Sequence, residues 1–363
     1  MPSEQKKIRV LVVDDSALMR KLISRLLEGD PEIEVIATAI DGSFALAKAA
    51  QLKPDVVTLD VDMPRMDGLT ALGELVSKYR IPVIMLSSHT TRGAALTMQA
   101  LEKGAVDFVC KPTGTARLPE MADELVSKIK AAARTNVAAL GNPLPGAARI
   151  KKKRVVEQAG KGGGKVVAIG ASSGGPHALR SFLPLIPPDF DAGIVIVQHM
   201  PESFTAMLAQ WLNEISYLQV KEAESGDLAL PGRVLIAPGN QHMKVRKTSS
   251  GCQVLLEGGV QVNGHKPSVD VLFRSVAEEY GPMATGIIMT GMGSDGAQGL
   301  GEIKKAGGNT VAQDKESCAV YGMPRIAVEK GYANKIVPLA EMASYLASEM
   351  GRLAALENSY ACK

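Results

Sequence analysis

Short aliphatic runs, each followed by an amphipathic helical stretch, recur through both halves of this chain. In the first half the runs are IRVLVVD, EVIATA, DVVTLDV, PVIMLSS and DFVCK, and in the second they include VVAIG, GIVIVQH, RVLIAPG and TGIIMTG. Strands that alternate with helices form parallel sheets that are covered on both faces. The pattern therefore predicts doubly wound α/β domains.

The alternation is interrupted once, by a stretch rich in Gly, Pro and Lys between residues 134 and 164 that has no hydrophobic period. Such a composition is typical of a flexible linker. A chain of 363 residues also favours two domains, at roughly 150 residues each. We therefore expect a flavodoxin-like domain, a linker, and a Rossmann-like three-layer α/β domain that contains a β-hairpin near residues 244–259. The boundaries that we expect are 6–130, 131–164 and 165–356.

Composition narrows the classes of partner. Lys and Arg number 41 and Asp and Glu 38, so a net charge of +3 gives no general attraction for nucleic acid. The basic run Lys151–Arg154 lies in the expected linker, where we interpret it as solvated. Four cysteines without a C-x-x-C pair indicate neither a zinc cage nor a disulfide framework. No apolar run reaches the ~18 residues of a membrane span, so we expect a cytoplasmic protein without membrane insertion.

Three acidic residues follow predicted strands of the first domain. Asp14 and Asp15 end the first strand, and Asp60 ends the third. The carboxyl ends of parallel strands line the ligand crevice of such a sheet, so these side chains should converge. Converging carboxylates repel one another unless a cation lies among them, and oxygen ligands suit Mg²⁺. The sequence therefore predicts a Mg²⁺ site.

Two further polar residues are expected at the same edge of the sheet. Ser87 ends the fourth strand, and Lys111 ends the fifth, where Lys111-Pro112 is a candidate cis peptide bond that would aim the lysine inward. A hydroxyl and an ammonium group there fit the binding of a phosphoryl group. Asp60 is then a candidate nucleophile that would form an aspartyl-phosphate.

An acid at a strand end is most often an ordinary loop cap, but here the polar residues follow strands one, three, four and five in order. With the segment TLDVDMPRMDGL, this arrangement resembles the response-regulator receiver domain over residues 8–130. The resemblance implies that Asp60 is the phosphoacceptor, that Ser87 and Lys111 act as switch residues, and that a histidine kinase is the phosphodonor. It also implies a set of side chains that hold Mg²⁺: Asp14, Asp15 and Asp60.

The second domain opens with a strand that runs into the turn GASSGG, residues 170–175. This turn fits G-x-S-x-G, a sharp strand-to-helix bend that exposes a serine hydroxyl above a sheet. Ser172 is at the centre of the motif, and we prefer it to Ser173 as the nucleophile. A glycine-rich phosphate or dinucleotide turn is the alternative, although neither G-x-G-x-x-G nor G-x-x-x-x-G-K-[ST] is present.

A serine nucleophile needs a base, and the chain has five histidines. His199 ends the strand GIVIVQH, at the same edge of the sheet as Ser172, which favours it, although a buried structural histidine is the alternative. The other four are less favoured. His89 lies in the first domain, and His177 lies in the helix after the turn, where we expect a surface residue. His242 and His265 lie near the hairpin, where they could line a cleft.

A third group must orient the imidazole. After the strand TGIIM, the turn TGMGSDG carries Asp295 at a strand's carboxyl end, and Asp270 and Asp314 are weaker candidates. An Asp beside glycine is usually only a turn former, so the choice depends on the whole set of residues. The order Ser, His, Asp differs from that of the α/β-hydrolases, but triads are defined by geometry.

With these residues in place, the chain resembles the protein-glutamate methylesterase (CheB) family of chemotaxis response regulators. The runs that carry the resemblance cover most of residues 165–330: IGASSGG, VIVQHMP, VLIAPGNQHM, VNGHKPSVDVLF, IIMTGMGSDGAQG and GMPR. The resemblance implies a catalytic triad of Ser172, His199 and Asp295 that needs no metal. It implies hydrolysis of γ-glutamyl methyl esters on the cytoplasmic helices of methyl-accepting chemoreceptors, and it allows deamidation of receptor glutamines.

The expected phosphoacceptor and the expected hydrolase lie on one chain. We therefore expect that the unphosphorylated receiver domain covers Ser172 and inhibits the hydrolase, and that phosphorylation of Asp60 relieves this inhibition. A different class of function is a phosphorylation-controlled binding protein that docks on a partner without hydrolysis. A DNA-binding output is disfavoured, because there is no helix-turn-helix pattern and the basic residues cluster only in the linker.

Overall fold

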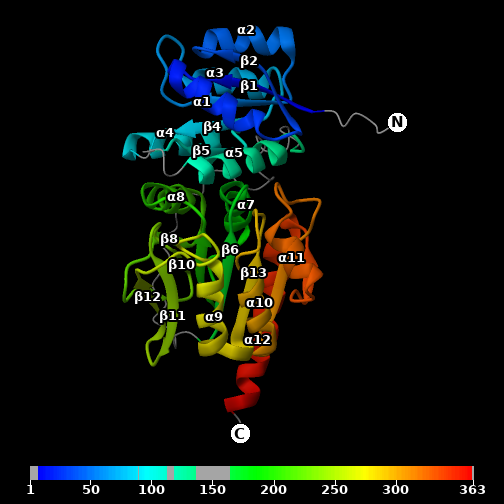
Figure 1. Ribbon diagram of the computed structural model, residues 1–363. Helices are drawn as coiled ribbons and strands as arrows, with labels where there is room; N and C mark the ends of the chain where they lie inside the picture. Colours follow the sequence, from blue (N-terminus) through cyan, green and yellow to red (C-terminus); the bar gives the residue numbers. More distant parts are fainter. Residues whose placement is uncertain (1–6, 89, 113–117, 136–163, 362–363) are drawn as a thin grey trace, which may run out of the picture. The chain divides into compact units, whose positions relative to one another are not determined.

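The computed structural model describes residues 7–88, 90–112, 118–135 and 164–361 (Figure 1). The chain divides into two compact units, one that ends at Asn142 and one that begins at Pro143. Each unit is described here by itself. Most of the expected linker, with its basic run, lies outside the described residues, so the domain boundaries stay a prediction.

The described strands of the first unit form a five-stranded parallel sheet in the order β2-β1-β3-β4-β5. The strands are β1 (Ile8–Val13), β2 (Ile33–Ala39), β3 (Val56–Asp60), β4 (Val83–Ser87) and β5 (Asp107–Cys110). The helices are α1 (Ala17–Glu28), α2 (Gly42–Leu52), α3 (Gly68–Ser77), α4 (Thr91–Glu102) and α5 (Leu118–Ala132). The expected doubly wound α/β fold is confirmed.

Helices cover both faces of this sheet, and the central strands β3 and β4 are buried along their whole length. One core cluster joins α1 and α5 to side chains of the strands, among them Val10 and Ile84. The other helices contact one another in series, α2 with α3 and α3 with α4. Each of the helices α1 to α4 begins at a side chain that accepts a hydrogen bond from the backbone N–H three residues on, and these N-caps are Ser16, Asp41, Asp67 and Thr90.

The second unit contains a parallel sheet of seven described strands in the order β15-β14-β13-β6-β7-β10-β8. The strands are β6 (Val166–Ala171), β7 (Gly193–Gln198), β8 (Gln219–Glu222), β10 (Arg233–Ile236), β13 (Ala284–Ile288), β14 (Asn309–Gln313) and β15 (Lys335–Val337). The helices are α7 (Gly175–Phe182), α8 (Glu202–Ile215), α9 (Val269–Tyr280), α10 (Ala297–Lys305), α11 (Met323–Glu329) and α12 (Met342–Ala361). A second α/β unit is thereby confirmed.

The expected hairpin is also present. Strands β11 (His242–Thr248) and β12 (Gly251–Glu257) pair antiparallel, and the short β9 (Leu228–Ala229) adds a third strand at the edge of β12. The sequence analysis did not identify β8, β9, β14 or β15.

Both parallel sheets have a point at which the strand order reverses. In the first unit, β1 lies between β2 and β3, and in the second, β6 lies between β7 and β13. Crevices that bind ligands form at the carboxyl ends of strands at such points. The residues that follow β1 and β3, and those that follow β6, β7 and β13, are therefore brought together by topology alone.

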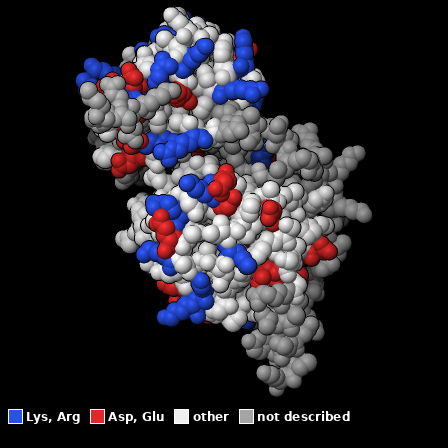
Figure 2. Space-filling view, turned by 90° about the vertical axis from the view of Figure 1, so that its right-hand side faces the viewer, with Lys and Arg blue, Asp and Glu red and all other residues white. Residues whose placement is uncertain are grey.

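Within the part of the chain that the structure describes, every helix is too short or too polar to span a bilayer. On the face shown in Figure 2, Lys and Arg are interspersed with Asp and Glu on both units. That face carries no extended basic field.

Candidate functional sites

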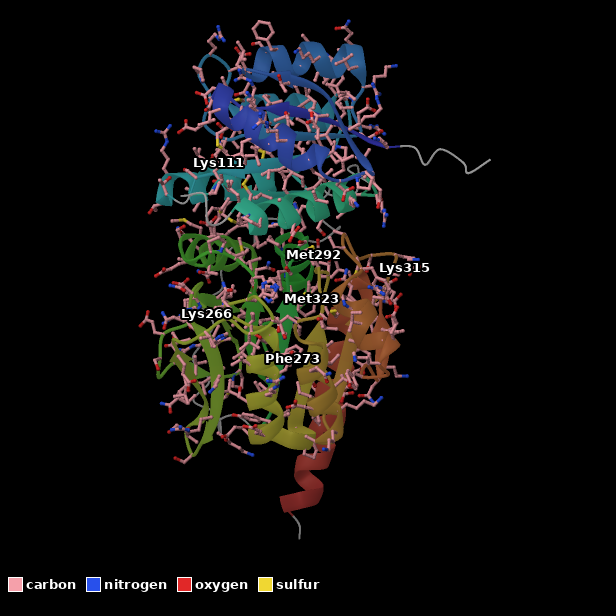
Figure 3. All side chains as sticks on the ribbon, in the orientation of Figure 1. Lys111, Lys266, Phe273, Met292, Lys315 and Met323 are labelled. Atoms are coloured by element: carbon pink, nitrogen blue, oxygen red, sulfur yellow. The ribbon has the colours of Figure 1, made fainter. Side chains whose placement is uncertain are left out.

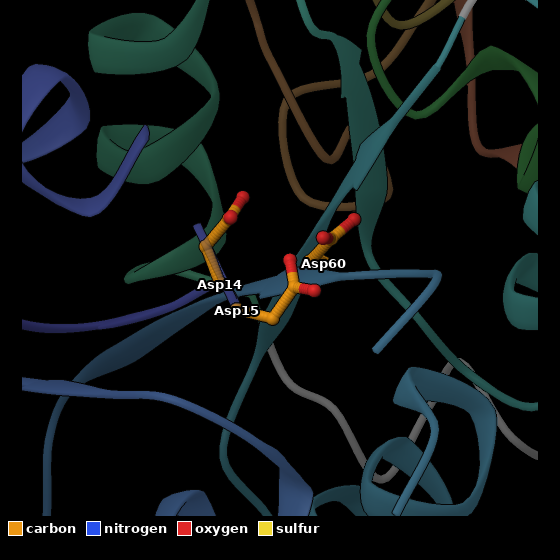
Figure 4. Close-up of side chains that lie close together, drawn as sticks. All are labelled: Asp14, Asp15 and Asp60. Atoms are coloured by element: carbon orange, nitrogen blue, oxygen red, sulfur yellow. The ribbon is translucent and has the colours of Figure 1, made fainter. Parts of the chain in front are cut away.

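The carboxylates of Asp14, Asp15 and Asp60 meet at the reversal point of the first sheet, as Figure 4 shows. One oxygen from each lies within 4.8 Å of the others, and Asp15 is exposed whereas the other two are buried. The one ammonium group that contacts these carboxylates in the described structure, that of Lys111, leaves an excess of negative charge. Clustered carboxylate oxygens are the donors that a hard divalent cation such as Mg²⁺ prefers, so these residues fit the expected metal.

Lys111, labelled in Figure 3, supplies that ammonium group. Its Nζ lies 2.7 Å from Asp14 Oδ2 and 2.7 Å from Asp60 Oδ2. The predicted cis bond at Lys111-Pro112 was wrong, because the cis peptide found among the described residues is Lys266–Pro267. The lysine reaches the acids from the end of β5 without it.

Burial raises the pKa of Asp60 to about 6, against the opposing effect of Lys111, and the charge of Asp14 acts in the same direction as burial. Burial would lower the pKa of Lys111, but its contacts with both carboxylates outweigh this and raise it. The raised pKa of Asp60 and the raised pKa of Lys111 are compatible, because the two buried carboxylates share a single ammonium group. One positive charge does not compensate two buried negative ones.

Ser87 is brought to the same edge, but its hydroxyl is bonded elsewhere. The buried Oγ donates to the carbonyl of Gly93, at 3.1 Å, and accepts a hydrogen bond from Thr97 Oγ1 at 2.8 Å. Both partners belong to α4. A role at a phosphoryl group therefore requires this hydroxyl to leave its bonds to α4.

The raised pKa of Asp60 leads to a pH-dependent prediction. Below pH 6 the carboxyl is mostly protonated, so we expect Mg²⁺ affinity, followed by titration of the full chain, to fall about fourfold from pH 7.5 to 5.5. Asp60→Asn should remove this pH dependence. The effect of pH on folding has the opposite sign. The contribution of Asp60 to the free energy of unfolding is fully present below pH 3.8 and is lost as pH rises through about 6. An Mg²⁺ affinity equal at both pH values would contradict the assignment.

In the second unit, Ser172 stands on the turn after β6 and is half-buried. Its backbone N–H donates to the carbonyl of Thr290, and its own carbonyl accepts from the N–H of Gly175, which tightens the bend into α7. Gly174 has φ 75°, a left-handed conformation that favours glycine.

Gly291 allows the neighbouring turn to approach this serine. A Cβ at Gly291 would lie 2.8 Å from the Cβ of Ser172 and 2.2 Å from the sulfur of Met323, which is labelled in Figure 3. Real Cβ atoms are not found so close to their neighbours. The turn after β13 therefore needs glycine at this position to pack against the serine.

His199 follows β7 directly, and its backbone N–H donates to the carbonyl of Ala171. Its side chain is only 7% exposed, and its Nε2 lies 2.9 Å from Asp295 Oδ2. Its Nδ1 is buried and has no partner among the described residues. Nδ1 is therefore the nitrogen that is free to serve Ser172, although no hydrogen bond joins them in the described structure. Catalytic hydrogen bonds commonly tighten only when substrate binds.

Asp295 is buried and accepts several hydrogen bonds. Oδ2 accepts from His199 and from the N–H of Val269 at 2.7 Å, whereas Oδ1 accepts from Asn263 Nδ2 and Ser268 Oγ, both at 2.8 Å. Burial would raise the pKa of Asp295, but the hydrogen bonds and the charge of His199 outweigh it and hold the pKa below its usual range. The group is therefore an anion fixed in one orientation.

The remaining histidines do not join this group as bases. His177, expected at the surface, is buried, so that expectation was wrong. His242 lies between the carbonyl of Val260, 2.9 Å from its Nε2, and the N–H of Ser268, which donates to Nδ1. His265 stacks on His199, with ring centroids 3.8 Å apart. His89 lies outside the described residues.

The two weaker acid candidates bond elsewhere. Asp270 accepts from the N–H of Gly299 and from Asn263 Nδ2, and Asp314 accepts from the N–H of Ser317. Burial raises the pKa of Asp270, and the charge of Asp295 adds to that shift. Asp295 is thus the candidate acid that contacts His199.

The sequence analysis assigned no role to Asn263, Ser268 or Gln198, which all contact the candidate triad. Gln198 is buried, and its Nε2 donates to the carbonyl of Ser172 at 2.9 Å and to that of His199 at 3.2 Å. Ser268 caps α9, a role that a serine before a helical run can indicate. Nothing in the sequence pattern places Asn263 beside the acid.

The arrangement is suited to acyl transfer. A hydroxyl on a tight turn, a base with one nitrogen unbonded in the described structure and a fixed anion behind it come from the ends of three neighbouring strands. That combination activates a serine to attack a carbonyl carbon and stabilises the charged imidazole that results.

Comparison with known proteins gives concordant results for both units. A family model described as CheB methylesterase matches residues 167–346, and one described as response regulator receiver domain matches residues 10–123. A protein-glutamate methylesterase/protein-glutamine glutaminase 2 of Koribacter versatilis is 50% identical over 346 residues, which cover 93% of this chain and 95% of that protein. A protein-glutamate methylesterase/protein-glutamine glutaminase of Symbiobacterium thermophilum is 46% identical over 359 residues, or 96% of this chain and 98% of that protein. The crystal structure of the Thermotoga maritima CheB methylesterase catalytic domain matches with 41% identity and a TM-score of 0.49, over 50% of this chain and 96% of that one.

Proposed function

This chain belongs to the CheB methylesterase family, and on that premise we propose that it is a phosphorylation-regulated protein-glutamate methylesterase of chemotaxis. Its substrates are the γ-glutamyl methyl esters of methyl-accepting chemoreceptors. The observation that carries the proposal is the contact between His199 and Asp295 beside the turn that bears Ser172. The relatives also bear the name protein-glutamine glutaminase, and the same site serves to deamidate receptor glutamines.

Hydrolysis proceeds in two steps at Ser172. His199 Nδ1 accepts the hydroxyl proton as Oγ attacks the ester carbonyl, and backbone N–H groups of the adjoining glycine-rich turns stabilise the oxyanion. Methanol leaves with that proton, and an acyl-enzyme remains on Ser172. His199 then takes a proton from water as the water oxygen attacks the acyl group. The bond between the acyl carbon and Ser172 Oγ breaks, Oγ takes the proton back from His199, and the glutamate carboxylate is released. Asp295 stabilises the imidazolium in both steps.

The residues of the first unit support regulation of this hydrolase. Asp60 accepts the phosphoryl group from a histidine kinase, and Lys111 contacts the phosphoryl oxygens. Asp14, Asp15 and Asp60 would hold Mg²⁺. Mg²⁺, when bound, offsets the charge of the acids and of the phosphoryl group. Ser87 exchanges its bonds to α4 for one to the phosphoryl group, and the unphosphorylated receiver restrains the hydrolase. Because the receptor segments that serve as substrate are cytoplasmic, we place the protein in the cytoplasm.

Methanol release from methyl-labelled receptor membranes tests the function. A coupling free energy of ~1–3 kcal/mol predicts that a small-molecule phosphodonor with Mg²⁺ raises the release rate about 5- to 150-fold. Asp60→Asn should keep the basal rate and lose the stimulation. Removal of residues 1–150 should raise the basal rate, because the restraint is lost. If no methanol were released either with or without the phosphodonor, the esterase proposal would be contradicted.

A further inference from the structure

The imidazole of His265 lies flat against the imidazole of His199. The ring centroids are 3.8 Å apart, and the planes differ by 11°. His265 belongs to the loop between β12 and α9, where its backbone pairs with Val262 through two hydrogen bonds of 3.0 Å. The loop thus holds this side chain against the base from a position 66 residues further along the chain than His199.

The hydrogen bond to Asp295 leaves one rotation of the His199 ring open. The contact at Nε2 holds one point of the ring, and Nδ1 has no partner within the described residues. A ring held at one nitrogen can still turn about that contact, and such a rotation carries Nδ1 away from Ser172. A flat group packed on its face removes this freedom.

We propose that His265 is a positioning residue, which fixes the plane of His199 by stacking so that Nδ1 stays directed at Ser172. The proposal rests on the function proposed above and deepens it. The same loop fixes the triad acid, since Asn263 Nδ2 and Ser268 Oγ both donate to Asp295. A single segment between β12 and α9 therefore orients both residues that carry charge during the reaction.

The electrostatics of His265 suit this role. Burial and, to a lesser degree, the charge of His199 together lower the pKa of His265 to about 4, although Asp295 opposes both. At neutral pH the ring of His265 is therefore uncharged. When His199 takes the proton of Ser172, the imidazolium lies against a neutral π face rather than a like charge.

His265 is not a second base in this arrangement. The hydrogen bonds that Asp295 accepts come from His199 and from the 263–270 segment, and none comes from the His265 ring in the described structure. An imidazole without an orienting acid is a poor candidate for general base. Its contact with the site is through the face of the His199 ring.

Three substitutions separate these roles: His265→Phe keeps a flat neutral ring, His265→Leu keeps bulk without flatness, and His265→Ala removes both. We measure kcat and KM for methanol release, hydrolysis of p-nitrophenyl acetate, and the rate at which a fluorophosphonate labels Ser172. Loss of alignment costs about 10- to 100-fold in kcat. We expect this loss for the Leu and Ala variants, a nearly unchanged KM, and recovery to within about threefold of wild type for the Phe variant.

Wild-type rates in the Ala and Leu variants would overturn the proposal, and so would a Phe variant as slow as Ala. A fall in melting temperature without a fall in kcat would also overturn it, by leaving His265 a purely structural role. The small ester and the probe report on Ser172 without receptors. Wild-type protein that reacts with both but releases no methanol would defeat the proposed function, while the comparison among the His265 variants would still decide the inference.

Discussion

Replacement of Ser172 by alanine is expected to reduce methanol release from methylated receptors by about 10⁴-fold or more. The hydroxyl forms the covalent intermediate, and removal of a nucleophile leaves only the acceleration that comes from binding and oxyanion contacts. The measurement is the rate of methanol release by the full chain at saturating receptor concentration. Phosphorylation of Asp60 should be unaffected, which shows that the variant is folded in its first unit.

Ser173→Ala is the matched control. Ser173 is buried, and its backbone carbonyl accepts a hydrogen bond from Thr290 Oγ1 at 2.9 Å. That hydrogen bond survives the substitution. We expect this variant to stay within about tenfold of wild type. The opposite pattern, a severe loss for Ser173→Ala and a mild one for Ser172→Ala, would move the nucleophile by one residue.

Asp295→Asn is expected to lower kcat by about 10³- to 10⁴-fold. The Asn amide can present an N–H group to Nε2 of His199, which favours the tautomer that carries its proton on Nδ1. That nitrogen could then no longer accept the proton of Ser172. In a triad of this kind, an isosteric Asp-to-Asn change has an effect of about 10⁴.

Asp270→Asn provides the control for this second prediction, because Asp270 is also buried and also bonds to Asn263. It makes no contact with His199 in the described structure, so we expect a loss of less than about tenfold. Equal losses in the two variants, measured as kcat for methanol release, would mean that Asp295 does not act through His199.

Much of both candidate sites could be predicted because topology places strand ends together. Asp14 and Asp60 lie at the ends of strands that are neighbours in the first sheet, and Ser172 and His199 follow neighbouring strands in the second. A hydrophobic run that ends in a polar residue is visible in the sequence, and the edge at which it ends follows from parallel pairing. The pairs therefore required no knowledge of loop conformation.

The contacts of the loop before α9 could not be predicted, because they depend on how an irregular segment folds. Asn263 and Gly264 have φ values of 53° and 78°, left-handed conformations in the segment from which Asn263 Nδ2 donates to Asp295. The contacts also join segments far apart in sequence, such as His265 and His199. Neither the hydrophobic period nor the motif spacing contains this information.

The helix α7 shows a different limit. His177 lies in the first turn of a helix that we expected to expose it, yet residues 175–179 are all buried. The helix contacts α8 and two 3₁₀ turns, Leu183–Leu185 and Leu339–Glu341. A periodic pattern cannot reveal a second covering layer. The strands β8 and β15 were missed because they are short edge strands with polar residues.

The central claim is that the Ser172 hydroxyl performs the hydrolysis, and covalent labelling tests it most directly. We would titrate the full chain with a fluorophosphonate, map the adduct by mass spectrometry, and measure methanol release on the same samples. The account predicts one adduct per chain, on Ser172, and a release rate that falls in proportion to labelling. Full labelling of Ser172 with an unchanged release rate, or lost activity with the adduct on another residue, would contradict it.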